Sequence, residues 1–383
     1  MFSGGTGTQA DPYLIATAED LNNVRNYLTS HFKQINDIDL SEYENWEPIG
    51  GEDYFLGIYN GGNFKITNLN IDRPLEDGIG LFSKLGGAPL TSSRNNYVKN
   101  CHILGHIRGR NNVGGLCGSS SFDRYYQEHI FYNCSFKGTV EGRNYVGGLI
   151  GLCLNDLECC YTEAVVNGSD YCGGLIGFLS NLSTGGRRHI TKQCYSNSNV
   201  IGSSRVGGLI GSIRDVIIED CYFVGSVFFD SLYSGYGGGG LIGSIRGFIE
   251  EPSILRCYSA CSIGAPSKFI NYGRGLVGRY ERGYSVDCYH RAMADDYSTL
   301  KTSVELKQQS TFVNWNFDTI WEIDGVTNDG YPYFRWSKPS DSNVYVKTSP
   351  TTIKKAIKTC IIDTPTTVKE IKKLNIITDT GLK

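Results

Sequence analysis

The chain has little proline and no long hydrophobic run, and both shortages limit the folds it can adopt. It contains 10 prolines and 48 glycines among 383 residues, and the glycines follow no G-X-Y period. Collagen is therefore excluded, and so many glycines predict frequent tight turns or close backbone contacts. No apolar run is long enough to span a bilayer, and the opening MFSGGTGTQADPY lacks the basic and apolar regions of a secretion signal. We expect neither membrane insertion nor a signal peptide.

Several common chemical motifs are also missing. The sequence contains no GxxxxGK[ST], HExxH or GxSxG pattern, so the usual phosphate loop, zinc-peptidase helix and nucleophile elbow are excluded. A net charge of −3 gives no nucleic-acid-binding signature. We therefore expect no cofactor, no metal site, no catalytic residue and no nucleic-acid partner.

A glycine-rich motif, most clearly VGGLIG, recurs along the middle of the chain. Steps of 26 to 35 residues separate its copies, and periods of this length are typical of stacked supersecondary units. The motif leucines are Leu81, Leu116, Leu149, Leu175, Leu209, Leu241 and Leu276.

A cysteine recurs with the same period and sets the direction of the neighbouring side chains. The ladder cysteines are Cys101, Cys134, Cys160, Cys194, Cys221, Cys257 and Cys288. The residues two and six positions after each cysteine are mostly apolar, for example Phe136 and Val140. The residue four positions after each cysteine is small. The next residue after each cysteine is polar or aromatic, as at Tyr161. Alternation of this kind predicts strands with one buried face.

These two markers together predict an all-β fold, a single-chain parallel β-helix (β-solenoid) over residues 81–300. The shortest repeat, 26 residues, fits one turn of three short strands, whereas a propeller blade needs about 40 residues. In this fold the glycines would occupy corners that need positive φ or close contact with the next turn. Each ladder cysteine is interpreted as a small buried hydrophobic residue without a disulfide bond.

The two ends of the body have features of caps. Residues 16–28 predict a helix with Thr17 as its N-cap, inside an N-terminal cap and first strands over residues 1–80. Residues 301–337 break the repeat and hold Trp315, Trp321 and Trp336. We expect these aromatic side chains to form a C-terminal cap that covers the last turn.

Residues 338–383 form a linker and a short basic tail. From Lys338 onward the chain has 9 Lys and 4 acidic residues, which gives +5 against −8 for the preceding body. A unit of the type PTT[IV]K occurs twice, and the apolar side chains between the lysines predict docking to another protein. The candidate anchoring residues are Lys354, Lys355, Ile357, Ile361, Val368, Ile371 and Leu374.

The VGGLIG copies, the CY dipeptides that begin several repeats, the opening GTGTQADPYLIATAEDLNNV and the closing NDGYPYFRW resemble the GLUG-motif repeat family. The resemblance covers the body and leaves out the tail. It implies a β-helical stalk or display region of bacterial surface and phage structural proteins, and it implies no activity. The copy GRGLVG departs from the pattern because Arg274 stands in a glycine position.

The candidate catalytic and metal-binding residues also have structural explanations. Some β-helices cleave polysaccharides with carboxylates clustered on adjacent turns. Asp220 and Asp287 precede ladder cysteines, with Arg256 in the turn between them, and this order favours an outward Asp–Arg–Asp charge ladder. His102 and His106 could share one face, but no second ligand cluster accompanies them to complete a zinc site.

Three classes of function remain from the sequence. The first is a non-enzymatic bacteriophage fibre or attachment protein that is assembled into the virion in the host cytoplasm. It would be joined to other virion or assembly proteins through the tail, and it could itself form a homo-oligomer. The second is a bacterial cell-surface adhesin or stalk, and the third a carbohydrate-active β-helix enzyme. The absence of a signal peptide favours the first.

The target expected for the attachment protein is a host surface glycan or protein. The longer loops, residues 119–132 and 179–192, would lie on one side of the solenoid, because loop lengths alternate along the repeats. Their tyrosine, histidine and arginine side chains suit sugar or protein surfaces. The candidate binding residues are Tyr125, Tyr126, His129, Arg187, Arg188 and His189.

Overall fold

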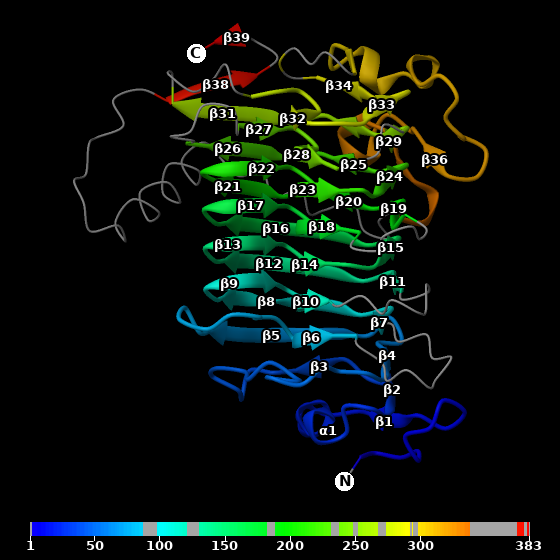
Figure 1. Cartoon of the computed structure of the whole chain (residues 1–383). Helices are drawn as coiled ribbons and strands as arrows, with labels where there is room; N and C mark the ends of the chain where they lie inside the picture. The colour runs from blue at the N-terminus through cyan, green and yellow to red at the C-terminus, as the bar shows by residue number, and fades with distance from the viewer. Residues whose placement is uncertain are drawn as a thin grey trace.

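The turns of the chain stack along one axis as a parallel β-solenoid (Figure 1). The computed structural model describes residues 2–86, 98–120, 130–181, 188–230, 237–247, 252–266, 273–291, 293, 298–337, 374–378 and 381–382. The expected all-β parallel solenoid is confirmed.

Four sheets run along the stack, and we name them A to D. Sheet A consists of β1 (Tyr13–Ile15), β2 (His31–Gln34), β4 (Ile58–Asn60), β7 (Val98–Lys99), β11 (Ile130–Tyr132), β15 (Asp156–Glu158), β19 (Ile190–Lys192), β24 (Ile217–Glu219), β29 (Pro252–Leu255) and β33 (Tyr284–Val286). Sheet C consists of β6 (Phe82–Leu85), β10 (Cys117–Ser120), β14 (Ile150–Cys153), β18 (Ile176–Ser180), β23 (Ile210–Arg214), β28 (Ile242–Arg246) and β32 (Val277–Tyr280).

Sheet B follows sheet A along the chain and precedes sheet D in the turns from β7 to β28. It consists of β3 (Ile38–Asp39), β5 (Lys65–Asp72), β8 (His102–Arg108), β12 (Ser135–Glu141), β16 (Tyr161–Asn167), β20 (Tyr195–Ser196), β21 (Asn199–Gly202), β25 (Tyr222–Phe223), β26 (Ser226–Phe229), β30 (Tyr258–Ser259), β31 (Ser262–Pro266), β34 (Tyr289–His290), β35 (Thr299–Leu300), β38 (Leu374–Thr378) and β39 (Gly381–Leu382). Sheet D consists of β9 (Asn111–Gly114), β13 (Asn144–Gly147), β17 (Asp170–Gly173), β22 (Ser204–Gly207) and β27 (Gly238–Gly239).

One turn, from β15 through β16 and β17 to β18, shows how the sequence pattern makes a rung. Thr162 and Val166 of β16 point inward and are fully buried, whereas the alternate residues are half-buried. Rungs pair in register, with Val140 opposite Val166 and Phe136 opposite Thr162. The rungs from β7 to β28 run through four sheets rather than the predicted three, because a D strand precedes the glycine corner.

The motif glycines allow neighbouring rungs to approach each other. A Cβ atom on Gly148 would lie 2.1 Å from the carbonyl oxygen of Gly174, and one on Gly174 would lie 2.2 Å from that of Gly208. Neither Gly148 nor Gly174 has a positive φ. Close contact, and not the left-handed conformation, therefore explains these corner glycines.

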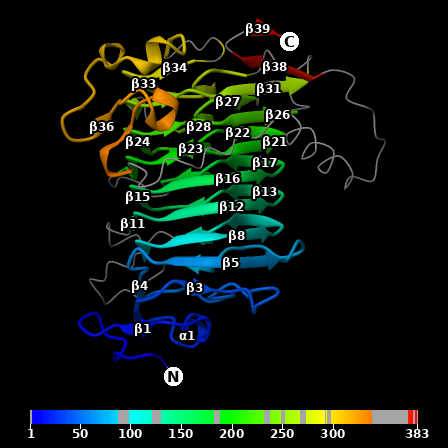
Figure 2. The same cartoon turned by 180° about the vertical axis from the view of Figure 1, so that it is seen from behind.

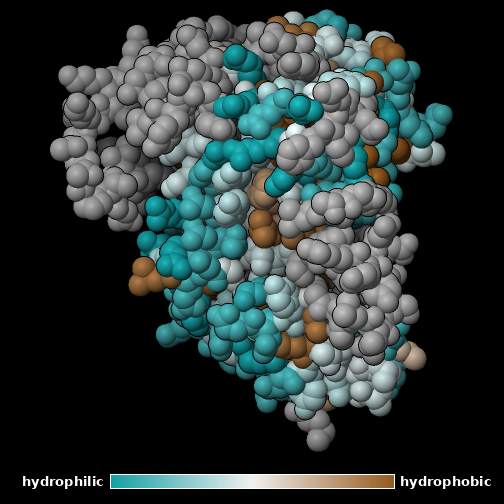
Figure 3. Space-filling model, viewed as in Figure 1, coloured by the Kyte–Doolittle hydropathy of each residue, from teal (hydrophilic) through white to brown (hydrophobic). Residues whose placement is uncertain are grey.

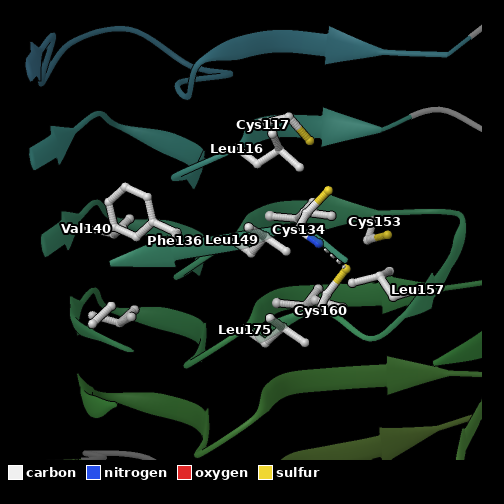
Figure 4. Close-up of a cluster of buried hydrophobic side chains, with 14 of the residues drawn as sticks. Leu116, Cys117, Cys134, Phe136, Val140, Leu149, Cys153, Leu157, Cys160 and Leu175 are labelled. Atoms are coloured by element: carbon white, nitrogen blue, oxygen red, sulfur yellow. Dashed lines mark hydrogen bonds between the residues drawn. The ribbon is translucent and has the colours of Figure 1, made fainter. Parts of the chain in front are cut away.

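The ladder cysteines are buried, as predicted, and they also make hydrogen bonds that the sequence did not suggest. The amide of Cys134 donates to the sulfur of Cys160 at 3.5 Å (Figure 4), and the thiol of Cys160 donates to its own rung at Glu158 O, 3.4 Å away. Similar amide–sulfur bonds join Cys160 to Cys194, Cys194 to Cys221, Cys221 to Cys257 and Cys257 to Cys288. A left-handed residue precedes each of these cysteines, for example Asn133 or Asp220, so the thiols satisfy amides at a corner.

The N-terminal end is covered by α1 (Ala18–Asn23) and η1 (Val24–Asn26) (Figure 1). Thr17 is the N-cap, and its hydroxyl accepts a hydrogen bond from the amide of Asp20 at 3.1 Å. Leu21 and Val24 are fully buried in the core. The helical cap predicted over residues 16–28 is therefore present, although its regular part is shorter than expected.

Residues 303–337, which we call the strap, lie along the outside of sheet B (Figure 2). They contain η3 (Glu305–Lys307), η4 (Gln309–Thr311), β36 (Trp321–Glu322), η5 (Thr327–Gly330), β37 (Tyr333–Phe334) and η6 (Arg335–Ser337). The strap packs on a column of outward tyrosines whose rings stack 4.8 to 5.2 Å apart, namely Tyr161, Tyr195, Tyr222 and Tyr258.

The strap reaches much further than the predicted cover of the last turn. Trp315 lies 6.0 Å from Tyr289 in the last rungs, whereas Trp336 lies 6.3 Å from Tyr161, far down the stack. Trp321 between them is fully buried. The aromatic residues therefore cover the side of several rungs, because the stacked tyrosines give them a continuous apolar surface.

Candidate functional site

Four long connections leave the solenoid at one corner, between sheets C and A. They join β6 to β7, β10 to β11, β18 to β19 and β28 to β29, and both predicted binding loops are among them. Two-residue turns join β14 to β15 and β23 to β24 at the same corner. The longer connections and the two-residue turns therefore share this corner of the stack.

Most of the candidate binding residues lie outside the residues that the structure describes. This applies to Tyr125, Tyr126, His129 and Arg187. Arg188 and His189 are described and lie at the base of the second loop.

His189 is buried, and its predicted place on a binding surface is wrong. Its Nδ1 atom lies 3.1 Å from Oδ1 of Asp156 in the rung below, and this carboxylate also accepts the amide of Ile190 at 2.9 Å. The pair fills the corner where β14 and β15 meet in a tight turn. His189 therefore holds the base of the loop and is shielded from a ligand.

Arg188 fixes the same loop to the rungs above it. Its Nη2 atom donates to the carbonyl of Val216 at 2.8 Å and to Oγ of Ser253 at 3.1 Å. One guanidinium thus bridges two further rungs across the tight turn between β23 and β24. The end of this connection is therefore rigidly held, which is useful for presenting side chains to a partner.

A second surface feature lies beside this corner, on the strands that lead to it. The aromatic–arginine cluster consists of Tyr145, Tyr171, Phe178, Arg205 and Arg246, all half-buried. The rings of Tyr145 and Tyr171 stack at 4.7 Å, and Phe178 lies 5.4 Å from Tyr171. The guanidinium of Arg205 lies 4.4 Å above the ring of Tyr171, and that of Arg246 lies 5.8 Å from it.

The backbone of this cluster adopts a conformation that its residues rarely use. Tyr145, Tyr171 and Arg205 have φ of 57°, 56° and 52°, and Asn112 takes the same position one rung below with φ of 54°. Asparagine tolerates this region, whereas a bulky side chain there is strained. Tyrosine and arginine therefore occupy backbone positions at which asparagine or glycine would be less strained.

The electrostatics of the cluster are mixed. Arg205 forms an ion pair with Asp170 on the neighbouring rung. Burial, with the nearby Tyr171 and Asp170, raises the pKa of Tyr145, so its phenol stays neutral at physiological pH. The cluster offers neutral hydroxyls, aromatic edges and guanidinium groups, a combination suited to sugars and polar protein surfaces.

The sequence contained a signal for this cluster that our interpretation missed. Tyr145, Tyr171 and Arg205 each stand immediately before the Val or Cys of the glycine motif, as in NYVGG, DYCGG and SRVGG. One outward, large residue in the same place of successive repeats predicts a column on the surface. Figure 3 shows small hydrophobic areas in the middle of the face seen in Figure 1, with hydrophilic side chains to their left.

The carboxylates considered for catalysis serve structural contacts. Arg256 donates through Nε to Asp220 at 2.9 Å and also pairs with Glu219. Asp220 is buried beneath the strap, and Trp321 Nε1 donates to it at 3.4 Å. Asp287 accepts a hydrogen bond from the side-chain amide of Asn314 in the strap at 3.0 Å. The Asp220–Arg256 pair faces outward from its rung, as predicted, but the strap covers it.

The described residues contain no group of three or more His, Cys, Asp or Glu side chains placed to hold a metal ion. No helix in the described ranges is long and apolar enough to cross a membrane.

Only the last of the candidate anchoring residues falls inside the described chain. Lys354, Lys355, Ile357, Ile361, Val368 and Ile371 lie outside it. Leu374 begins β38, which pairs with β31 of the same chain. This part of the predicted anchor is therefore joined to its own solenoid, because β31 offers an edge where a strand can add.

No family model matches the chain, so the resemblance to GLUG-motif repeats stays a prediction. A part of the chain is 38% identical, over 133 residues, to a protein of Evansella cellulosilytica named "Putative Gly-rich membrane protein". The match covers 33% of this chain and 15% of that protein. Another part is 29% identical, over 149 residues, to "Halomucin" of Haloquadratum walsbyi, and covers 30% of this chain and 2% of that protein. The matches thus span only a small share of either relative.

A solved structure shares the fold over nearly the whole chain. It is the crystal structure of a "putative immunoglobulin A1 protease" from Bacteroides ovatus, with a TM-score of 0.55 and 21% identity. The similarity covers 88% of this chain and 96% of that one. At this identity the likeness concerns the fold alone.

Proposed function

We propose that the chain is a non-enzymatic attachment module, which binds a glycan or protein on a surface through one side of a rigid solenoid. The binding side consists of the corner between sheets C and A together with the aromatic–arginine cluster. The observation that carries the proposal is their adjacency, because Phe178 lies on β18, the strand that leads directly into the connection to β19.

The physical argument rests on rigidity. Hydrogen bonds from Arg188 and the His189–Asp156 pair tie the base of the β18–β19 connection to rungs on both sides. A loop that is held at its base loses less conformational entropy on binding than one on a flexible stalk. The strained tyrosines beside it support a binding role, since such strain concentrates at functional sites.

Two carriers are candidates for this module, namely a virion and a bacterial cell. The virion fibre or attachment protein remains our first proposal, with the tail as its link to the particle. The bacterial cell-surface adhesin gains support from the word "membrane" in the name of the Evansella relative. The pairing of β38 with β31 also supports it, because that segment is already occupied within the chain.

We propose no catalytic activity for the chain. Asp220 is engaged by both Arg256 and Trp321, and burial raises the pKa of its carboxyl group against the opposing effect of Arg256. A hydrolase needs a carboxylate that reaches substrate, and this one lies under the strap. Among the described residues, Asp220 therefore gives no support to the carbohydrate-active enzyme.

A binding experiment with matched variants tests the proposed surface. The full chain is screened against glycans and against intact cells, and the hits are repeated with Tyr145→Asn and Tyr171→Asn. Asparagine keeps the left-handed backbone, so folding is preserved while the aromatic ring is lost. We expect binding to fall at least about tenfold, whereas Tyr54→Asn, at an exposed tyrosine of the N-terminal rungs, leaves it unchanged. Equal binding by all variants would remove the cluster from the proposal.

A further inference from the structure

The strand β38 pairs with the solenoid in a way that departs from the rung pattern. It runs antiparallel to β31, with Ile377 opposite Ile263 and Leu374 opposite Pro266. The described rungs of sheet B pair with one another in parallel, as β26 does with β31. Thus β38, continued by the hairpin partner β39, is a strand added to the edge of the stack from outside the repeat.

The position that β38 occupies is an edge that needs a partner. Ile263 and Ala265 of β31 are fully buried, and the neighbouring half of sheet B continues upward through β34 and β35. An uncovered β31 would present unpaired backbone groups next to an apolar interior, which is a template for pairing with another chain. The hairpin removes this hazard within one molecule.

The length of chain before β38 allows more than one way to fill that edge. Trp336 lies against Tyr161 at the start of β16, and β38 is four strand spacings further along sheet B and about eight residues further along the strands. The two points are therefore about 30 Å apart. Residues 338–373 could span about 120 Å when extended, so the same hairpin could reach a neighbouring molecule.

We propose that the β31 edge accepts the β38–β39 hairpin of a second copy of this chain, giving a reciprocal exchanged dimer. Exchange preserves every strand pairing and needs no new surface, which makes it a low-cost route to a dimer. A tether of this length holds the hairpin at an effective concentration on the order of 1 mM. The dimer is therefore a small fraction of the protein in dilute solution, and this fraction rises where copies of the chain are concentrated.

The exchange depends only on β31, on the hairpin and on tether length, and it is independent of the proposed binding surface. It would nevertheless raise the number of binding surfaces in one assembly from one to two. A paired module would bind an array of ligands more tightly than either copy alone.

The test removes the possibility of pairing within one chain. Deleting residues 341–372 leaves four residues between the strap and β38, which span about 18 Å at most and cannot cover about 30 Å. We expect the shortened chain to be a dimer at about 10 μM, a concentration far below the effective concentration of the natural tether. Light scattering after size-exclusion chromatography would then show a doubling of the mass, with the full chain as monomer.

Two controls separate exchange from other association. Replacing residues 341–372 by a Gly/Ser segment of equal length should restore the monomer. Adding Ile376→Pro and Ile377→Pro to the shortened chain removes strand amides and should abolish the dimer. A shortened chain that stays monomeric, or a dimer that survives the two prolines, would overturn the proposal.

Discussion

The amide nitrogen of Cys160 donates to the sulfur of Cys194 in the next rung, 3.4 Å away. The residue before Cys160 has a positive φ of 55°, and a turn of this kind takes the amide that follows it out of the strand ladder. A buried amide without a partner is costly, and a thiol is small enough to serve as acceptor inside the core. The column of cysteines therefore has a polar role that an alanine or valine could not fill.

Replacing Cys194 by alanine should lower the free energy of unfolding by about 2–3 kcal/mol, from a lost acceptor and a small cavity. Chemical denaturation measures this change. Cys117→Ala is the matched control, because Cys117 is equally buried and no such amide–sulfur bond is found for it among the described residues. The control should lose only about 1 kcal/mol of packing, and equal losses in both variants would contradict the hydrogen-bonding role.

The buried thiols should be unreactive in the native protein. Burial raises the pKa of Cys101 and of Cys153 to about 12, so the reactive thiolate of these two is scarce at pH 8. Burial also opposes ionisation of Cys221, but hydrogen bonds with Cys194 and Cys257 lower its pKa to about 6, so its protection depends on exclusion of the reagent from the core. The 12 described cysteines, all free and buried, should resist alkylation until denaturant is added. Mass spectrometry after a short iodoacetamide pulse checks this, and rapid labelling of Cys134 or Cys221 would refute the inward assignment.

Substitutions at two glycines separate the stability cost of lost space from the cost of an unfavourable backbone conformation. Gly51 has φ of 54° and open space on the side where a Cβ atom would lie, so Gly51→Ala should cost about 1 kcal/mol. Gly148 has no positive φ but no room for a Cβ atom, and Gly148→Ala should cost about 3 kcal/mol. Thermal unfolding of both variants tests the order, and a smaller loss at Gly148 would contradict the rung-contact explanation.

The strap should depend on Trp321. Trp321→Ala removes a fully buried ring and should cost about 3–5 kcal/mol. Trp321→Phe keeps much of the packing but loses the bond from Nε1 to Asp220, and should cost about 1 kcal/mol. Hydrogen exchange of the strap amides would report its detachment, and the rungs from β5 to β12 should stay protected in both variants.

Acid should loosen the part of the strap between β36 and β37. Burial opposes ionisation of Asp324, but hydrogen bonds from Thr327, Val326 and Tyr333 outweigh it and lower the pKa of the carboxyl group to about 2. A lowered folded pKa means that the stabilisation is complete above the unfolded value near 4 and is lost as pH falls towards 2. Tryptophan fluorescence of the native chain should change in this window, and Asp324→Asn should remove that change.

The repeating part of the fold could be predicted because its signals are local and periodic. The spacing of Cys160, Cys194 and Cys221 predicted the length of a rung. The alternation of the residues after each cysteine predicted which side chains point inward and which point outward. Thr17 gave the start of the helical cap for the same reason. The four strands per rung were missed, since the short D strand and the glycine corner merge into one motif.

The contacts between distant segments could not be predicted in this way. Trp336 and Tyr161 are far apart in the sequence, and hydrophobic attraction has no direction that would indicate which rung the strap reaches. The burial of His189 likewise depends on Asp156 in another rung. Histidine in a polar loop is usually exposed, so its sequence neighbourhood alone suggested a binding residue.

The strap also makes the two halves of the stack mechanically unequal. The strands of a solenoid lie across its axis, so tension along the axis would separate rungs one after another. Between β16 and β34, however, the strap contacts the tyrosine column in successive rungs, and these rungs must part from it together. Under such tension we expect the N-terminal rungs, from β4 to β12, to open first and to lengthen the molecule while the strapped half remains intact.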